Sequence, residues 1–155
     1  MWIVNADGQR NGPFYKETYD EWVTHETWWG SNKALFTIWP KNEVMLKKPH
    51  GIGYVTLEDR SLHILDQRKY WHVGASPDGK WAVGDTFAGE IFLVGVDSGG
   101  ARLLTQGHRP QGATVHPHPS ISPDGTKILF CSEKNGNWDL CFVNLSSMED
   151  LRHEK

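Results

Sequence analysis

Hydrophobic and polar positions alternate in short runs along most of the chain, and glycine, proline, aspartate and asparagine separate the runs. Such alternation between turn-forming residues is typical of β-strands. It predicts strands at 2–5, 34–39, 53–58, 61–66, 81–85, 90–97, 101–105, 127–132 and 139–145. Only the segment 15–26 has a helical pattern in the body of the chain, and it predicts a short, weak helix.

A turn sequence recurs along the chain at a fixed distance. Ser-Pro-Asp-Gly begins at Ser76 and again at Ser122, 46 residues later, and Asn32 lies 46 residues before Asp78 in a degraded copy of the motif. Proline fixes φ and Asp-Gly accepts the geometry of a tight turn, so each copy predicts a turn between two strands. A period in the forties with about four short strands per unit is the signature of β-propeller blades.

The predicted fold class is therefore all-β, with about three four-stranded antiparallel propeller blades. We expect one partial propeller domain over residues 1–155, with 1–16 as outer strands of an incomplete blade, blades at 25–66, 72–106 and 116–145, and a tail at 146–155. Three blades are too few to close a ring, so we expect this chain to be part of a larger propeller. Open blade edges also favour self-association.

Composition narrows the partners. The 155 residues are 38% hydrophobic and 23% charged, with a net charge of −3, which does not favour nucleic acid. No apolar run has the length of a membrane span, and the first residues lack the pattern of a signal peptide, so we expect a cytoplasmic protein that binds no membrane. Cys131 and Cys141 are interpreted as free thiols rather than a disulfide.

Histidines occur at matching positions of the repeat. His72 and His118 each stand four residues before the serine of a Ser-Pro-Asp-Gly turn, and His25 matches them with one residue of slippage. Innermost strands of a propeller converge on its axis, so these side chains are expected to meet there. His116 projects with His118, because residues i and i+2 of a strand point to one face. Three imidazoles with an open position predict a catalytic metal site, whereas the histidines at 50, 63, 108 and 153 are expected to be solvated.

Three sequence stretches resemble a known family. THETWW from Thr24, YWHVGASPDGKWAVGDT from Tyr70, and HPHPSISPDGTKILFCSEKNGNWDLCFV from His116 resemble the C-terminal blades of oligogalacturonate lyases, which carry TolB-like propeller repeats. The resemblance implies a cytoplasmic seven-bladed propeller that degrades short pectin fragments. It implies metal-dependent β-elimination of oligogalacturonides to unsaturated uronates, with weak or no activity of this partial chain alone.

The resemblance also implies residue roles. A divalent ion, Mn²⁺ or a similar metal, would be held by His72, His116, His118 and Gln111, although Ala113 holds the place of the family's glutamine. His25 would be the base that removes the proton beside the uronate carboxylate, which the cation would stabilise as charge develops. Trp28 and Arg68 are candidate contacts to the sugar substrate.

Two other functions fit the same residues. A non-enzymatic TolB-like propeller module that binds a protein or a sugar would need no metal. An unrelated metallohydrolase is a third alternative, because histidine donors alone do not select manganese over zinc or iron.

Overall fold

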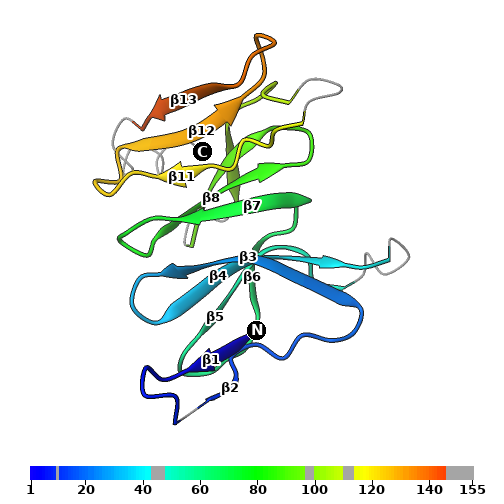
Figure 1. The fold of residues 1–155 in the computed structure, drawn as a ribbon, viewed down its shortest axis with the longest axis vertical. Helices are drawn as coiled ribbons and strands as arrows, with labels where there is room; N and C mark the ends of the chain where they lie inside the picture. Colours follow the sequence, from blue (N-terminus) through cyan, green and yellow to red (C-terminus); the bar gives the residue numbers. More distant parts are fainter. Residues whose placement is uncertain (10, 43–47, 97–99, 110–113, 146–155) are drawn as a thin grey trace.

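The computed structural model describes residues 1–9, 11–42, 48–96, 100–109 and 114–145. These residues contain strands and turns and no helix, so the all-β expectation is confirmed. Four antiparallel sheets lie one after another along the longest axis (Figure 1). Their strands follow the chain order within each sheet, as expected when tight turns join neighbouring antiparallel strands.

The N-terminal hairpin is the smallest sheet and contains β1 (Trp2–Val4) and β2 (Asn11–Pro13). The first sheet contains β3 (Glu21–Trp29), β4 (Lys33–Pro40), β5 (Gly51–Thr56) and β6 (His63–Asp66). The second sheet contains β7 (Tyr70–Ala75), β8 (Trp81–Thr86), β9 (Ile91–Gly95) and β10 (Ala101–Thr105). The third sheet contains β11 (Ser120–Ile121), β12 (Lys127–Ser132) and β13 (Asp139–Asn144).

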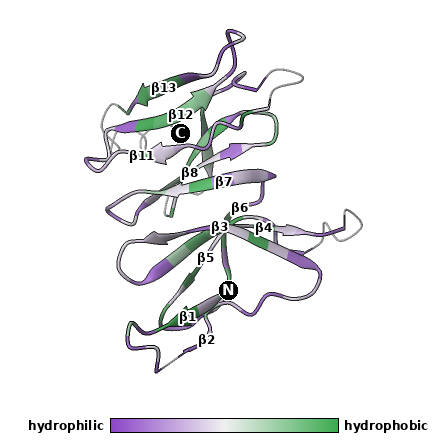
Figure 2. Cartoon of the chain, in the orientation of Figure 1, coloured by the Kyte–Doolittle hydropathy of each residue, from purple (hydrophilic) through white to green (hydrophobic). Residues whose placement is uncertain are grey.

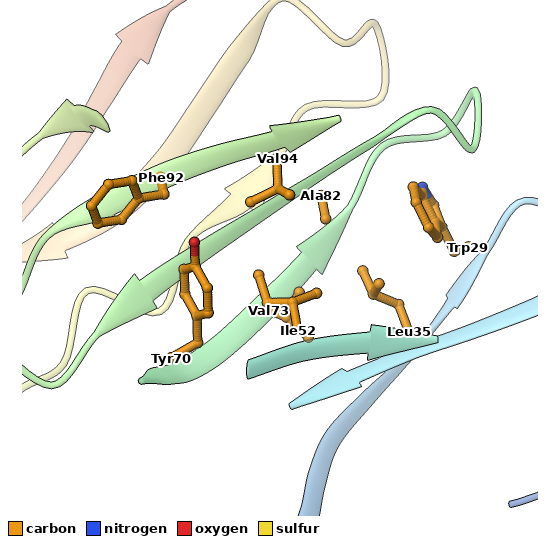
Figure 3. Close-up of a cluster of buried hydrophobic side chains, with 8 residues drawn as sticks. All are labelled: Trp29, Leu35, Ile52, Tyr70, Val73, Ala82, Phe92 and Val94. Carbon is orange, nitrogen blue, oxygen red and sulfur yellow. The ribbon is translucent and has the colours of Figure 1, made fainter. Parts of the chain in front are cut away.

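Apolar side chains fill the three spaces between successive sheets, and Figure 2 shows hydrophobic colour along the strands with hydrophilic colour at the turns. Ile3 of the N-terminal hairpin packs against a buried cluster that includes Phe36 and Ile38 of the first sheet. The first and second sheets share the cluster in Figure 3, to which Trp29, Leu35, Ile52, Tyr70, Val73, Ala82, Phe92 and Val94 contribute. A further cluster of Trp81, Val83, Ile91, Leu93, Ile128, Phe130 and Leu145 joins the second and third sheets. Each sheet is thus held chiefly by its neighbours in the stack.

The first strands of the first, second and third sheets lie side by side. Strand β7 contacts both β3 and β11, which brings together the three strands that open the sheets. Gly74 allows the second of these approaches, because a Cβ atom there would lie 2.8 Å from the carbonyl oxygen of Pro119. Residues within β3 and β7 and just before β11 therefore come close together.

The structure corrects the helix predicted at 15–26. Strand β3 begins at Glu21 and pairs with β4, with Trp22 opposite Trp39 and Val23 opposite Ile38. Pairing to a buried neighbouring strand outweighs the weak helical pattern of this segment.

Cys131 and Cys141 are both free, as predicted. The tail expected at 146–155 lies outside the described residues.

Candidate functional site

His25 projects from an irregular point of β3. The pairing of β3 with β4 shifts between Thr24 and Thr27, so a bulge interrupts the strand at His25 and Glu26. His25 has a φ of 57°, in the left-handed region that residues with a side chain rarely adopt. Bulges of this kind re-aim a side chain out of the regular alternation. The ring Nδ1 of His25 lies 3.5 Å from the Thr37 hydroxyl, which is within hydrogen-bond reach of the backbone oxygens of Thr24 and Trp71.

His72 lies in a matching irregularity of the second sheet. The pairing of β7 with β8 shifts between Tyr70 and Val73, around Trp71 and His72. The side chain of His72 is buried against Asp85, whose carboxylate oxygens lie 3.0 and 3.1 Å from Nδ1. The carboxylate oxygens accept hydrogen bonds, so the contact places a hydrogen on Nδ1 of His72, and in the neutral ring Nε2 then keeps its lone pair. Asp85 therefore sets the tautomer that a metal ligand requires.

His116 and His118 lie on the segment that leads into β11, and two carboxylates hold that segment. The backbone nitrogen of His118 donates to Asp85 at 3.4 Å, so the same carboxylate contacts both the second and the third sheets. The carboxylate of Glu133 accepts hydrogen bonds from the backbone nitrogens of Thr114 and Val115, at 3.0 and 3.2 Å. His118 has a φ of 48°, a second left-handed histidine beside the first. Its conformation turns the chain between the two sheets.

The four imidazoles come together at this junction. The ring centroid of His72 lies 4.4 Å from that of His25, 4.0 Å from that of His118 and 5.6 Å from that of His116. The ring centroids of His25 and His118 are 6.4 Å apart. His72 is buried, His25 and His116 are half-buried, and His118 is exposed. The cluster is therefore closed on the side of Asp85 and open to solvent on the side of His118.

An aromatic wall flanks the histidine cluster. The Trp71 ring stacks on His116 at 4.3 Å and meets the edge of Phe87 at 4.2 Å. Trp39 packs against Trp71 and Phe87 at 5.6 and 5.0 Å. Apolar rings on one side and an open mouth on the other are typical of a ligand site, where a few polar groups project from an apolar lining.

The environment favours the neutral forms of His25 and His116. Burial lowers the pKa of His25, and the neighbouring His72 and His118 lower it further because imidazolium ions repel one another. Burial also lowers the pKa of His116, with the charge of Arg109 as the next cause. Neutral imidazoles are the form that ligates a metal or accepts a proton.

A divalent ion can be tested against this donor set. Among the residues that the structure describes, no group of three or more histidine, cysteine or carboxylate side chains is arranged to hold a metal ion as it stands. The chemistry of the donors nevertheless fits such an ion, because neutral imidazoles are the usual nitrogen ligands of transition metals. The Nδ1 atom of His116 is buried without a hydrogen-bond partner in the described structure, and such an atom is available as a ligand.

The other residues proposed from the sequence lie apart from this cluster or outside the described residues. Gln111 is among the residues that the structure does not describe. Trp28 is 56% exposed and lines a pocket with Met1, Trp2 and Phe14, beside the N-terminal hairpin. Arg68 pairs with Asp66 and lies over the Phe92 ring, 4.6 Å from its centroid. The positive charge of Arg68 is thus already matched by a carboxylate at the β6–β7 connection.

Sequence reasoning missed three residues of this region. Trp71, Arg109 and Glu133 have no place in the repeat, and only the adjacency of Trp71 to His72 could have drawn attention to it. His108 was expected to be solvated, but it is buried between Thr105 and Ser132, whose hydroxyl oxygens lie 2.8 and 3.1 Å from its ring nitrogens.

Successive antiparallel sheets whose first strands converge on one line define the class of β-propeller blades. No protein-family model matches the chain. The sequence is 26% identical to the oligogalacturonide lyase of Pectobacterium atrosepticum in an alignment of 160 positions, gaps included, which covers 88% of this chain and 40% of that enzyme. The oligogalacturonate lyase of Dickeya dadantii matches with the same identity and coverage. The resemblance that the three sequence stretches indicate is thereby confirmed.

Solved structures agree on the fold. An oligogalacturonate lyase in complex with manganese has a TM-score of 0.77 at 22% identity, over 94% of this chain and 41% of its own. The oligogalacturonate lyase of Vibrio parahaemolyticus has a TM-score of 0.74 at 20% identity, over 96% and 42%. TolB from Acinetobacter baumannii has a TM-score of 0.69 at 14% identity, over 94% and 35%. The predicted propeller blades are confirmed.

The chain spans 40% of the length of the curated relatives that it matches. Within the described residues, no helix has the length and apolar character needed to cross a membrane.

Proposed function

We propose that this chain forms the metal-binding blades of an oligogalacturonate lyase, which cleaves short oligogalacturonides by β-elimination and gives unsaturated uronates. Convergence of His25, His72, His116 and His118, in a chain similar to such lyases, carries the proposal. Residues 1–155 are taken as one partial propeller domain with the blade boundaries expected from the sequence, and a cytoplasmic location stays a prediction.

In the proposed site, His72, His116 and His118 hold a divalent ion, taken as manganese, with Gln111 as a further ligand. A divalent ion bound there would supply Lewis-acid stabilisation for the charge that develops at the uronate carboxylate. Asp85 supports the assignment of His72, since it leaves the Nε2 lone pair free. Half-buried His116, with an unpartnered Nδ1, supplies a second donor.

His25 is the proposed base. Its pKa is lowered by burial and by its imidazole neighbours, so the ring is neutral and accepts a proton near neutral pH. The ring takes the proton from C5 of the uronate, the C4–O bond breaks, and a C4–C5 double bond forms. The departing oxygen takes up a proton from solvent, and His25 then releases its proton to solvent. Trp28 and Arg68 remain proposed contacts for more distant parts of the sugar chain.

Metal binding is the first test, because the chain spans only part of its relatives. Manganese titrated into the metal-free protein should raise the thermal midpoint and quench the free-Mn²⁺ spin resonance signal. His72→Ala should abolish both effects. His63→Ala is the matched control, since His63 lies on β6, at the opposite edge of the first sheet from β3, and is paired with Asp59. Equal responses of His72→Ala and His63→Ala to manganese would refute the assignment of His72 as a metal ligand.

Activity is the second test. Digalacturonate and manganese should give a rise in ultraviolet absorbance from the unsaturated uronate, and His25→Ala should abolish it. A TolB-like binding module without catalysis is the alternative, favoured by the finding that the described side chains do not form a complete metal shell as they stand. That alternative predicts neither a thermal shift with manganese nor any change in absorbance.

A further inference from the structure

Arg109 is held in place beside the histidine cluster by its own backbone. It follows β10 and packs on Gly89 in the β8–β9 turn, where a Cβ atom would lie 2.6 Å from Cβ and 2.7 Å from the backbone nitrogen of Arg109. Gly89 has a φ of 79°, so the turn itself also favours glycine. The backbone nitrogen of His108 contacts the Gly89 oxygen at 3.4 Å. The backbone of residue 109 thus packs against the second sheet, although the residue lies in a connecting segment.

The guanidinium of Arg109 has unused hydrogen-bonding capacity. One terminal nitrogen, Nη1, donates to the backbone oxygen of Phe87 at 2.9 Å. The Nε–H group is buried and has no partner among the described residues. Arginine is always charged and carries five N–H donors, and proteins leave few buried donors unsatisfied. Within the part of the chain that the structure describes, this N–H is therefore a donor that the acceptor group of a bound ligand can satisfy.

The carboxylate of Glu133 does not supply that acceptor. Its oxygens accept from the backbone nitrogens of Thr114 and Val115, and from the indole nitrogen of Trp138 at 2.7 Å. Glu133 thus fixes the segment that leads to His116, while the Nε–H of Arg109 has no acceptor in the part of the chain that the structure describes.

The surroundings of Arg109 connect it to the proposed catalytic site. The Phe87 ring meets Trp71, and Trp71 stacks on His116, so one continuous aromatic surface leads from the arginine to the imidazoles. Lys69 brings a second positive charge, 5.7 Å from the centre of the Phe87 ring.

We propose that Arg109 binds the carboxylate of a uronate next to the one at the histidines, so that the enzyme reads a pair of adjacent acidic sugars. The inference rests on the proposed function and extends it to a second sugar position. A guanidinium matches the planar, bidentate geometry of a carboxylate, and the aromatic surface between the two positions suits the face of a sugar ring. Arg109 is a binding residue in this proposal and takes no part in proton transfer.

Equilibrium binding in the presence of a chelator tests the proposal separately from metal chemistry. The probes are digalacturonate and its dimethyl ester, which keeps the sugar rings but removes both charges. Binding is followed by calorimetry and by the fluorescence of the protein. Wild-type protein is expected to prefer the acid, and Arg109→Gln should reduce that preference about 10-fold, which is the effect of losing about 1.4 kcal/mol. Arg109→Lys should retain part of the preference for the acid, because lysine keeps the positive charge but cannot donate two parallel hydrogen bonds from a planar group.

Arg102→Gln is the matched control, because Arg102 is exposed on the outermost strand of the same sheet, and it should bind as wild type does. Gly89→Ala leaves the arginine in the sequence but displaces its backbone, and it should lower the preference for the acid as well. Thermal midpoints of all variants monitor folding. The proposal is overturned if wild-type protein does not distinguish acid from ester, or if Arg109→Gln binds digalacturonate as tightly as wild type.

A preference for the acid that depends on Arg109 would stand even if manganese neither binds nor activates the protein. In that outcome the proposed lyase chemistry fails and the anion site remains. Conversely, manganese-dependent elimination with no role for Arg109 would leave the lyase proposal intact and refute this one.

Discussion

Replacing Asp85 by asparagine should weaken both the histidine cluster and the contact between the second and third sheets. The Asp85 carboxylate is 0% exposed and accepts from the backbone nitrogen of His72 at 2.8 Å, from its Nδ1 at 3.0 Å and from the backbone nitrogen of His118 at 3.4 Å. An amide has the same shape but only one oxygen, so at least one of these donors faces an NH₂ group. If Nδ1 of His72 accepts from that group instead, Nε2 carries the hydrogen and cannot ligate a metal.

The expected magnitudes follow from these contacts. Loss of one hydrogen bond to a charged group costs about 1.5–3 kcal/mol of stability, and 1 kcal/mol lowers the thermal midpoint of a chain of this size by about 2–4 °C. Asp85→Asn should therefore melt about 3–12 °C below wild type. Removing the carboxylate partner of a ligating histidine typically lowers metal affinity about 10–100-fold, and the same loss is expected for manganese here.

Thermal denaturation with and without manganese, together with a manganese titration, measures both effects of Asp85→Asn. Asp7→Asn is the control, because Asp7 is exposed and accepts a hydrogen bond only locally, from the backbone of Gln9. Unchanged manganese affinity in Asp85→Asn would refute the tautomer argument. A lowered affinity with an unchanged midpoint would instead refute the account of how Asp85 joins the two sheets.

Three further predictions concern other parts of the molecule. His118→Gly should be more stable than His118→Ala by about 1 kcal/mol, because a φ of 48° is left-handed, and equal thermal midpoints would contradict this. Burial lowers the pKa of His108 below its usual 6.5, so the unfolded chain binds the proton more readily, and stability should fall as the pH drops through 6.5 towards the lower folded value. His108→Gln should have a flatter stability profile in urea denaturation over this range, and an unchanged slope would argue against it. Leu140 and Phe142 are 70% and 59% exposed on the third sheet, so replacing both by serine should reduce self-association in analytical ultracentrifugation, whereas a wild type that sediments as a monomer would remove the expectation.

The turns of the fold could be predicted because their chemistry is local. In the Ser-Pro-Asp-Gly segment at 76–79, the Ser76 hydroxyl bonds to the Asp78 carboxylate, and Gly79 has a φ of 71°. The interactions that favour this turn thus lie among neighbouring residues. The repeat then gave the strand order, since each turn joins neighbouring antiparallel strands.

Only part of the histidine cluster could be predicted from the sequence. The repeat predicted that His25, His72 and His118 share a position, but the bulge that turns His25 depends on pairing with β4, and no pattern at 15–26 indicated a strand. Contacts between residues far apart in the sequence could not be predicted either, because they too depend on how distant segments pack. The seat of Arg109 on Gly89 joins residues 20 positions apart, and neither residue has a motif around it.

Gly74 has a consequence for any ion that the cluster holds. Its missing side chain lets the carbonyl of Pro119 approach, and this approach fixes how far the His116–His118 segment stands from β7. The absence of a side chain at residue 74 thus allows the close spacing between β7 and the segment that carries His116 and His118. If the proposed metal site is correct, a larger side chain at residue 74 would separate His72 from His116 and His118 and would weaken metal binding, although every histidine would remain in the sequence.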